Sequence, residues 1–198
     1  MMADVCTKLQ SIDYSGKLVI SIAAGISAVR LEEMLNAKLN LVRVMPNTPS
    51  LVGKGMSGLF APACVSQVDK DFAADLMSAV GKVCWVETEN QINNIIAAAG
   101  SAPAYFFLFM EAMQAEAISQ GFDKQTARLL VEQSALGAAA MVQSNPNTEL
   151  STLRENVTSK GGTTAEALRT FNQHQISDIV SKAMQAAVAR AQAMEQQF

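Results

Sequence analysis

Cysteine, histidine and clustered basic residues are all scarce in this 198-residue sequence, and each scarcity excludes a class of function. The three cysteines, Cys6, Cys64 and Cys84, form no C-x-x-C pair, so neither a disulfide framework nor a zinc site is expected. His174 is the only histidine, which argues against zinc peptidase and Ser-His-Asp hydrolase chemistry. Lysine and arginine are scattered and the formal net charge is -3, so we expect no nucleic-acid partner. No other pattern indicates a bound metal.

A secretion signal is also missing from the first residues, which carry neither a basic cluster nor an apolar run. Together with the unpaired cysteines, this pattern predicts a cytoplasmic protein. The segment 90–110 carries no charge, but polar amides open it, and Gly100 and Pro103 interrupt it. Because a membrane-spanning helix needs about 20 predominantly apolar residues, we expect a buried helix of a soluble or oligomeric core and no membrane partner.

The first 88 residues alternate strand and helix patterns, which is typical of an α/β fold. The strands are few, so their sheet would lack one side. One helix is expected to follow Ser27 as far as Leu39. A capping box at Ser66 starts another helix, with Gly81 as its stop. The predicted strands are Lys17–Ile22, Leu41–Met45, Met56–Ala61 and Lys82–Val86.

From residue 89 onward the strand pattern disappears and long helical patterns follow. The sequence therefore predicts an α/β half, residues 1–88, and an all-α half, residues 89–198. Several helices are apolar on more than one face, and a helix of that kind must be covered on all sides. We expect a second copy to cover them, in an intertwined homodimer or larger oligomer; a monomeric bundle with an apolar surface is the alternative. The predicted helices are Ile92–Ala99, Ala104–Gln120, Lys124–Ser144, Thr163–Asn172 and Ser177–Gln197.

Two patterns that suggest chemistry have a simpler structural interpretation. Gly53–Gly58 matches G-x-G-x-x-G, but a dinucleotide-binding loop of that kind follows a strand and opens a helix. Here the glycines follow a proline-rich loop and lead into a strand, so we interpret the segment as a flexible loop. Acidic pairs such as Glu87 and Glu89 are interpreted as surface charges, and not as a catalytic dyad.

Small and polar residues follow two neighbouring strands. Ala23-Ala24-Gly25 comes after the first strand, and Pro46-Asn47-Thr48-Pro49 comes after the second. The carboxyl ends of parallel strands meet at one edge, where open α/β sheets bind ligands. A tight strand–helix turn is the alternative for the first loop, but two such loops at one edge favour a cleft.

The segment 156–166 carries the most chemistry. Thr163-x-x-Glu166 is a capping-box pattern, which predicts that a helix starts there. Gly161 and Gly162 precede it and free the backbone to turn N–H groups outward, where the helix dipole would favour a small anion such as a carboxylate. A plain Gly-Gly turn before a capped helix is an equal alternative. Neutral hydroxyls are added by Ser159, Thr163 and Thr164.

These motifs, taken in order, resemble the pyrroline-5-carboxylate reductase family across essentially the whole chain. The most specific stretch is Leu150–Asn172, with L-x-x-x-V-T-S-x-G-G-T-T running from Leu153 to Thr164. Other landmarks are Val44–Pro49 and Gly100–Tyr105, where Ala102 replaces the more usual glycine. The resemblance implies that residues 1–88 are the C-terminal part of a Rossmann-type dinucleotide-binding domain. It also implies that residues 89–198 are an all-helical dimerisation and substrate-binding domain.

The same resemblance implies an oxidoreductase that transfers hydride from NADPH or NADH to the C=N bond of 1-pyrroline-5-carboxylate, giving L-proline as the last step of proline biosynthesis. Thr164, the implied catalytic residue, would also bind substrate through the ring nitrogen. The substrate carboxylate would be held by Ser159, Gly161, Gly162 and Thr163. The nicotinamide pocket would be lined by Ala24, Asn47, Thr48 and Pro49, and closed from the partner subunit by Asn156 and Val157.

The family pattern begins with a strand, a Gly-rich loop and a helix that bind the cofactor pyrophosphate, and this sequence does not contain that unit. We therefore expect an N-terminally truncated reductase that keeps the nicotinamide side and the substrate loop. Two alternatives stay open: a non-catalytic remnant that only dimerises, and a related imine or β-hydroxyacid reductase. The Gly-Gly-Thr-Thr loop favours proline chemistry over the latter.

Overall fold

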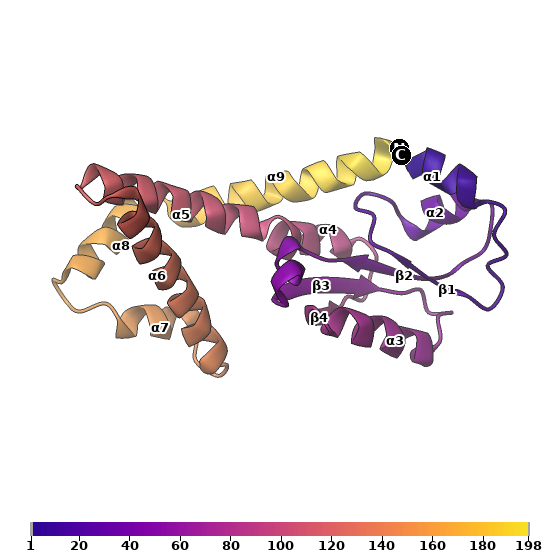
Figure 1. Ribbon diagram of the computed structural model, residues 1–198, viewed down its shortest axis with the longest axis horizontal. Helices are drawn as coiled ribbons and strands as arrows, with labels where there is room; N and C mark the ends of the chain where they lie inside the picture. The colour runs from indigo at the N-terminus through magenta and orange to yellow at the C-terminus, as the bar shows by residue number, and fades with distance from the viewer. Residues whose placement is uncertain (1, 198) are drawn as a thin grey trace. The chain divides into compact units, whose positions relative to one another are not determined.

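The computed structural model describes residues 2–197, which form two compact units (Figure 1). The first unit consists of Met1–Pro103 together with Ala183–Phe198, and the second consists of Ala104–Lys182. The last helix of the chain therefore contributes to both units. The predicted domain boundary after residue 88 stays a prediction, because these two units are defined by contacts within the chain and need not coincide with functional domains.

A four-stranded sheet in the order β1-β2-β3-β4 forms the centre of the first unit. The strands β1 and β2 are parallel, β2 and β3 are antiparallel, and β3 and β4 are parallel. All four predicted strands are confirmed to within one residue at each end. The bounds are β1 Leu18–Ser21, β2 Asn40–Met45, β3 Gly55–Phe60 and β4 Gly81–Trp85.

Helices cover both faces of this sheet (Figure 1). The helices α1 (Met2–Leu9) and α2 (Ala28–Leu35) pack with Leu41 of β2 in one buried cluster. The helix α3 (Gln67–Ser78) packs with Val42 and Val44 in another. Successive side chains of a strand point to opposite faces, so the apolar residues of β2 on either side of Arg43 supply both clusters.

The two predicted helix stops in this unit are wrong. The helix α2 ends at Leu35 and not at Leu39, because Asn36 takes a left-handed conformation (φ 51°) and its N–H bonds back to the carbonyls of Glu32 and Glu33. The helix α3 ends at Ser78, and Gly81 begins β4 instead. A Cβ on Gly81 would lie 2.0 Å from the carbonyl oxygen of Gly55, so the strand pairing requires glycine there.

The interpretation of Gly53–Gly58 as a flexible loop is wrong for most of its length. Gly53 closes the 3-10 helix η1 (Thr48–Val52) in a left-handed conformation with φ 67°. From Gly55 the chain is strand β3, and Gly58 lies against the side chain of Ile95, where an added Cβ would come within 2.6 Å. The glycines therefore allow close packing of β3.

The chain leaves the sheet through α4 (Gln91–Ile95) and a π-helical turn, η2 (Ile96–Gly100), in which the N–H of Ser101 bonds to the carbonyl of Ile96 at 2.7 Å. With the helix that follows, Gln91–Ser119 forms one helical stretch of 29 residues that contains an 18-residue window with a mean hydropathy of 1.5, long and apolar enough by those measures to cross a membrane. Its first part, Ile92 and Asn93, is buried within the first unit. That the stretch belongs to a protein core stays a prediction.

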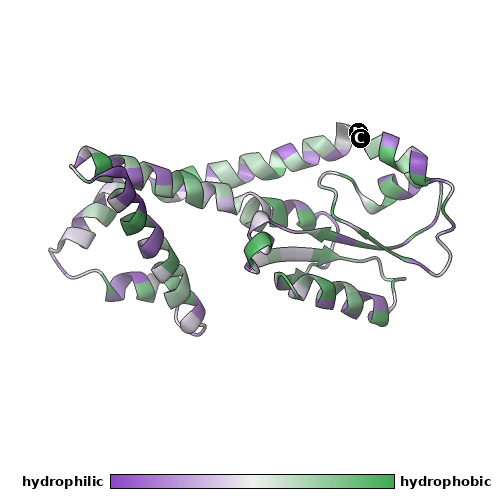
Figure 2. Cartoon of the chain, in the orientation of Figure 1, coloured by the Kyte–Doolittle hydropathy of each residue, from purple (hydrophilic) through white to green (hydrophobic). Residues whose placement is uncertain are grey.

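The second unit is entirely helical over its described residues. The helix α7, with the sequence LSTLREN, was not predicted, because it offers few apolar positions at helical spacing. Hydrophobic residues recur along the helices of this unit (Figure 2), and many of them are exposed; in α5 four consecutive residues, Phe106 to Phe109, are each at least 45% exposed. The bounds are α5 Ala102–Ser119, α6 Lys124–Ser144, α7 Leu150–Asn156, α8 Thr163–Gln173 and α9 Ile176–Gln197.

Candidate functional site

The connection between α7 and α8 in the second unit is a tight, exposed turn. The N–H of Gly162 donates to the carbonyl of Ser159 at 3.0 Å, and Gly161 adopts φ 73°. A Cβ on Gly162 would lie 2.3 Å from the Ser159 hydroxyl, so a larger residue at position 162 would require the Ser159 side chain to rotate. The left-handed backbone of Gly161 favours glycine, and Gly162 leaves room for the Ser159 side chain.

The predicted capping box at the start of α8 is wrong in its detail. Gly162 and not Thr163 is the N-cap, and no side chain caps the helix. Thr163 is the first helical residue, and the N–H of Glu166 makes the first intrahelical bond, to the carbonyl of Gly162 at 3.3 Å. The N–H groups of a helix's first turn have no intrahelical partner, so without a side-chain cap they face outward at the positive end of the dipole.

Neutral hydroxyls surround this helix start. Ser159, Thr163 and Thr164 are all exposed and lie within six positions of one another along the chain. Glu166, a carboxylate in the first turn of α8, is engaged by the Arg169 guanidinium, whose hydrogen bond lowers the pKa of Glu166. The pairing offsets a negative charge that would otherwise repel an anion, so the turn can accept a carboxylate.

Two loops meet at the carboxyl edge of β1 and β2 in the first unit. The strands are parallel with Ser21 opposite Arg43, which places the turn after β1 and the loop after β2 at the same edge, as predicted. Ala24 and Thr48 are exposed there, and their small side chains leave room for a flat ring to approach the backbone. That Ala24 and Thr48 line a nicotinamide pocket stays a prediction.

Asn47 has a structural role that sequence patterns did not indicate. Its Nδ2 donates to the carbonyl of Ala99 in η2 at 3.0 Å, and its Oδ1 accepts from the N–H of Met56 in β3 at 2.8 Å. Both ends of its amide are used within the first unit. The side chain of Asn47 therefore holds the loop, and only its backbone is left to face a ligand.

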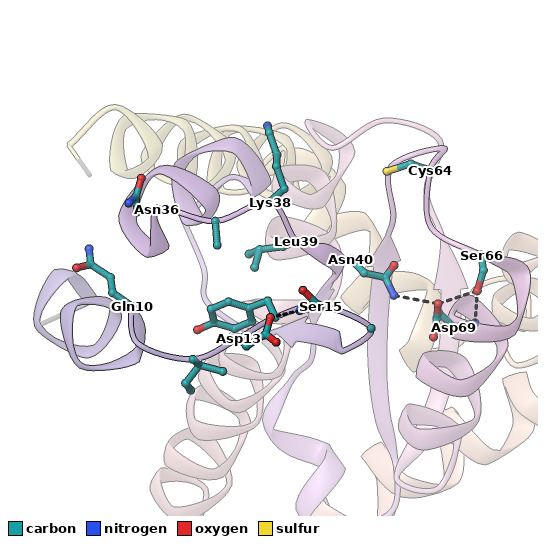
Figure 3. Close-up of a pocket in the computed structure, with 14 residues that line it drawn as sticks. Gln10, Asp13, Ser15, Asn36, Lys38, Leu39, Asn40, Cys64, Ser66 and Asp69 are labelled. Atoms are coloured by element: carbon teal, nitrogen blue, oxygen red, sulfur yellow. Dashed lines mark hydrogen bonds between the residues drawn. The ribbon is translucent and has the colours of Figure 1, made fainter.

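A cavity of about 670 Å³ lies at the other end of the strands, where the chain enters β1 and β2 (Figure 3). Three of its polar side chains bond to one another: Asn40 and Ser66 both bond to Asp69, and the Ser66 hydroxyl is the main cause of a lowered pKa for that carboxyl. No predicted site residue lines it. The described residues contain no group of three His, Cys, Asp or Glu side chains arranged to hold a metal ion.

The helical half of the chain is similar to a known protein family. Residues 89–194 match the family model for pyrroline-5-carboxylate reductase dimerisation. The chain belongs to the pyrroline-5-carboxylate reductase family. The match confirms the resemblance seen in the sequence, and a dimerisation domain supports self-association of the chain.

Relatives and solved structures of this family cover the chain over nearly its whole length. It is 78% identical over 198 residues to the pyrroline-5-carboxylate reductase of Vibrio alginolyticus and 57% identical to that of Pasteurella multocida, covering 100% of this chain and 73% and 72% of those proteins. The reductase structure from Coxiella burnetii superposes with a TM-score of 0.89 at 43% identity, covering 98% of this chain and 72% of that one. The NADP-bound Plasmodium falciparum pyrroline carboxylate reductase gives a TM-score of 0.87 at 31% identity, covering 98% and 74%.

These likenesses confirm the predicted fold class, a partial Rossmann-type sheet with a helical dimerisation domain. They also favour a pyrroline-5-carboxylate reductase over a related imine or β-hydroxyacid reductase. The roles of the individual site residues stay predictions, because the family match identifies the fold and not the contacts of each side chain.

Proposed function

We propose that this chain reduces 1-pyrroline-5-carboxylate to L-proline with NADPH or NADH as hydride donor, the last step of proline biosynthesis. The observation that carries the proposal is the turn Ser159–Gly162 at the start of α8, which presents backbone N–H groups and neutral hydroxyls to a small carboxylate. The reductases it resembles act on a substrate that carries such a group.

The substrate carboxylate is held by Ser159, Gly161, Gly162 and Thr163. This contact fixes one end of the five-membered ring and with it the orientation of the C=N carbon. Thr164, one residue further into α8, places its hydroxyl on the ring nitrogen. Reduction adds a hydride to that carbon and a proton to the nitrogen, and the Thr164 hydroxyl orients the nitrogen as it gains its proton.

A bound nicotinamide would supply the hydride, and the residues that would line its ring are Ala24, Asn47, Thr48 and Pro49 in the first unit. The loop is held through the Asn47 amide, so its shape does not depend on the cofactor. A second copy of the chain would close the pocket with its own Asn156 and Val157. We further propose a functional boundary after residue 88, with residues 89–198 as the dimerisation and substrate-binding domain, and a cytoplasmic location.

Thr164→Ala tests the catalytic assignment. We expect turnover to fall on the order of 100-fold, because one hydrogen bond to the reacting nitrogen is lost, while the circular dichroism of the chain stays the same. Thr170→Ala is the matched control: it lies on the same helix, and its hydroxyl bonds to the carbonyl of Glu166 at 3.2 Å. Unchanged kinetics in Thr164→Ala would remove Thr164 from the chemistry. Absence of NADPH-dependent reduction in the unsubstituted chain would contradict the proposed function itself.

A further inference from the structure

A buried arginine lies in the middle of the sheet. Arg43 of β2 is 2% exposed and faces the same side as Leu41, two residues before it. Its Nη1 lies 2.8 Å from Oε1 of Glu89, which precedes α4, and 3.6 Å from Oε1 of Glu195 near the end of α9. The interpretation of Glu89 as a surface charge is therefore wrong. The ion pairs join residues 46 and 152 positions apart, which no local pattern reveals.

A fourth residue completes the cluster. Asn93 of α4 is fully buried and donates from Nδ2 to Oε2 of Glu195 at 3.1 Å. The end of α9 is therefore tied to the sheet by a carboxylate that two buried side chains share. A buried charge is stable only when it is paired and hydrogen-bonded, so the cluster holds as a set.

This cluster also reaches the turn after β1. Oε1 of Glu89 accepts a second hydrogen bond, at 2.6 Å, from the N–H of Ala28, the first residue of α2. Gly25 of the same turn is buried against α9: a Cβ added to it would lie 3.0 Å from Cβ of Met194. Glu89 thus holds the turn at its helix end, while the last part of α9 covers it at Gly25.

Charge explains why the arginine is indispensable to the arrangement. The cluster contains one guanidinium and two carboxylates, and the N-terminus of α2 adds a partial positive charge at Glu89. Without Arg43, Glu89 and Glu195 would face each other across a partly buried space as like charges. Repulsion and desolvation would then drive the end of α9 away from the turn.

We propose that Arg43 is a positioning residue for the cofactor: acting through Glu89 and Glu195, it fixes the turn 23–27 in the shape that receives the nicotinamide. This role rests on the proposed function, because the turn includes Ala24, which is expected to line the nicotinamide pocket. The end of α9, which is far from this turn in the sequence, then contributes to the same site through Glu195. Arg43 itself touches neither substrate nor cofactor.

Hydrogen–deuterium exchange tests the positioning without any assay of activity. In Arg43→Met, whose side chain has similar length and no charge, we expect the amides of residues 23–28 to exchange at least about tenfold faster, because Ala28 N–H loses its fixed acceptor. The matched control is Arg128→Met, which breaks an exposed ion pair with Glu132 in the second unit. Equal exchange in Arg43→Met and in the unsubstituted chain would overturn the proposal. If Arg43→Met fails to fold, Glu195→Gln takes its place in the test. The amides of residues 23–28 must then exchange faster in Glu195→Gln than in the unsubstituted chain.

Steady-state kinetics separate positioning from a general loss of stability. We expect Arg43→Met to raise the KM for NADPH about tenfold with little change in the KM for pyrroline-5-carboxylate, and Arg43→Lys to restore part of the loss. A uniform loss of activity, with both KM values unchanged, would contradict the role. If the unsubstituted chain reduces no substrate, the proposed function fails, and the exchange of residues 23–28 alone decides whether Arg43 fixes the turn.

Discussion

At the scale of single residues, burial sets chemistry that composition cannot show. The three thiols occupy three environments: Cys64 is exposed, Cys84 is half-buried and Cys6 is buried at 2% exposure. Desolvation raises the pKa of Cys84, and only the thiolate form of cysteine is a nucleophile. A raised pKa means that less of the Cys84 thiol is ionised at any pH below it.

Alkylation rates follow from these environments. With iodoacetamide near pH 8 we expect Cys64 to react first, Cys84 more slowly and Cys6 last, as followed by peptide mass spectrometry. In concentrated urea the three rates should converge, because burial no longer distinguishes them. Modification of Cys84 as fast as Cys64 in the folded chain would show that its burial does not suppress the thiolate.

At the scale of elements, sequence patterns predicted the helix starts and the strands, which depend on residues close together in the chain. Ser27 and Ser66 cap α2 and α3 as expected, with their hydroxyls accepting from the N–H groups of Arg30 and Asp69. The strands followed from apolar runs. The misplaced stops at Leu39 and Gly81 share a cause: Asn36 and the β3–β4 pairing end or replace helix through backbone geometry that composition does not encode.

Gly81→Ala should be one of the most damaging small substitutions in the sheet. Its Cβ would lie 2.0 Å from a backbone oxygen of β3, so we expect a loss of about 3 kcal/mol in the free energy of unfolding, measured by urea denaturation. Gly53→Asn is the control, because nothing lies within 4 Å of its Cβ and asparagine tolerates the left-handed conformation. Equal stability of the two variants would rule out the close approach of β3 and β4.

At the scale of the whole molecule, strand and helix patterns and the family motifs predicted the fold class, and helices apolar on several faces predicted self-association, but no pattern predicted the long-range contacts. The apolar surface of α5 was visible as a pattern that left no polar face. The site loops were located because their residues are contiguous. The Arg43 cluster was missed because its four members come from three separate stretches of the chain, and each looks ordinary in its own neighbourhood.

Self-association through α5 has a direct test. We expect the unsubstituted chain to sediment as a dimer or larger species, and Leu108→Glu to shift it toward monomer, because a carboxylate would be buried in an apolar contact. Gln67→Glu adds the same charge to exposed α3 and should leave the assembly intact. A stable monomer of the unsubstituted chain in sedimentation equilibrium would contradict an oligomer built on this surface.

The bonds of Asn47 limit which amino acids position 47 can accept. Aspartate would set a carboxylate oxygen against the carbonyl of Ala99, and leucine would leave that carbonyl and the Met56 N–H without their present partner. Only a short amide offers a donor and an acceptor at those places. Folding alone therefore favours asparagine at position 47 in any protein with the same loop, whether or not that protein binds a ligand. The presence of asparagine at position 47 is then no evidence that a protein is catalytically active.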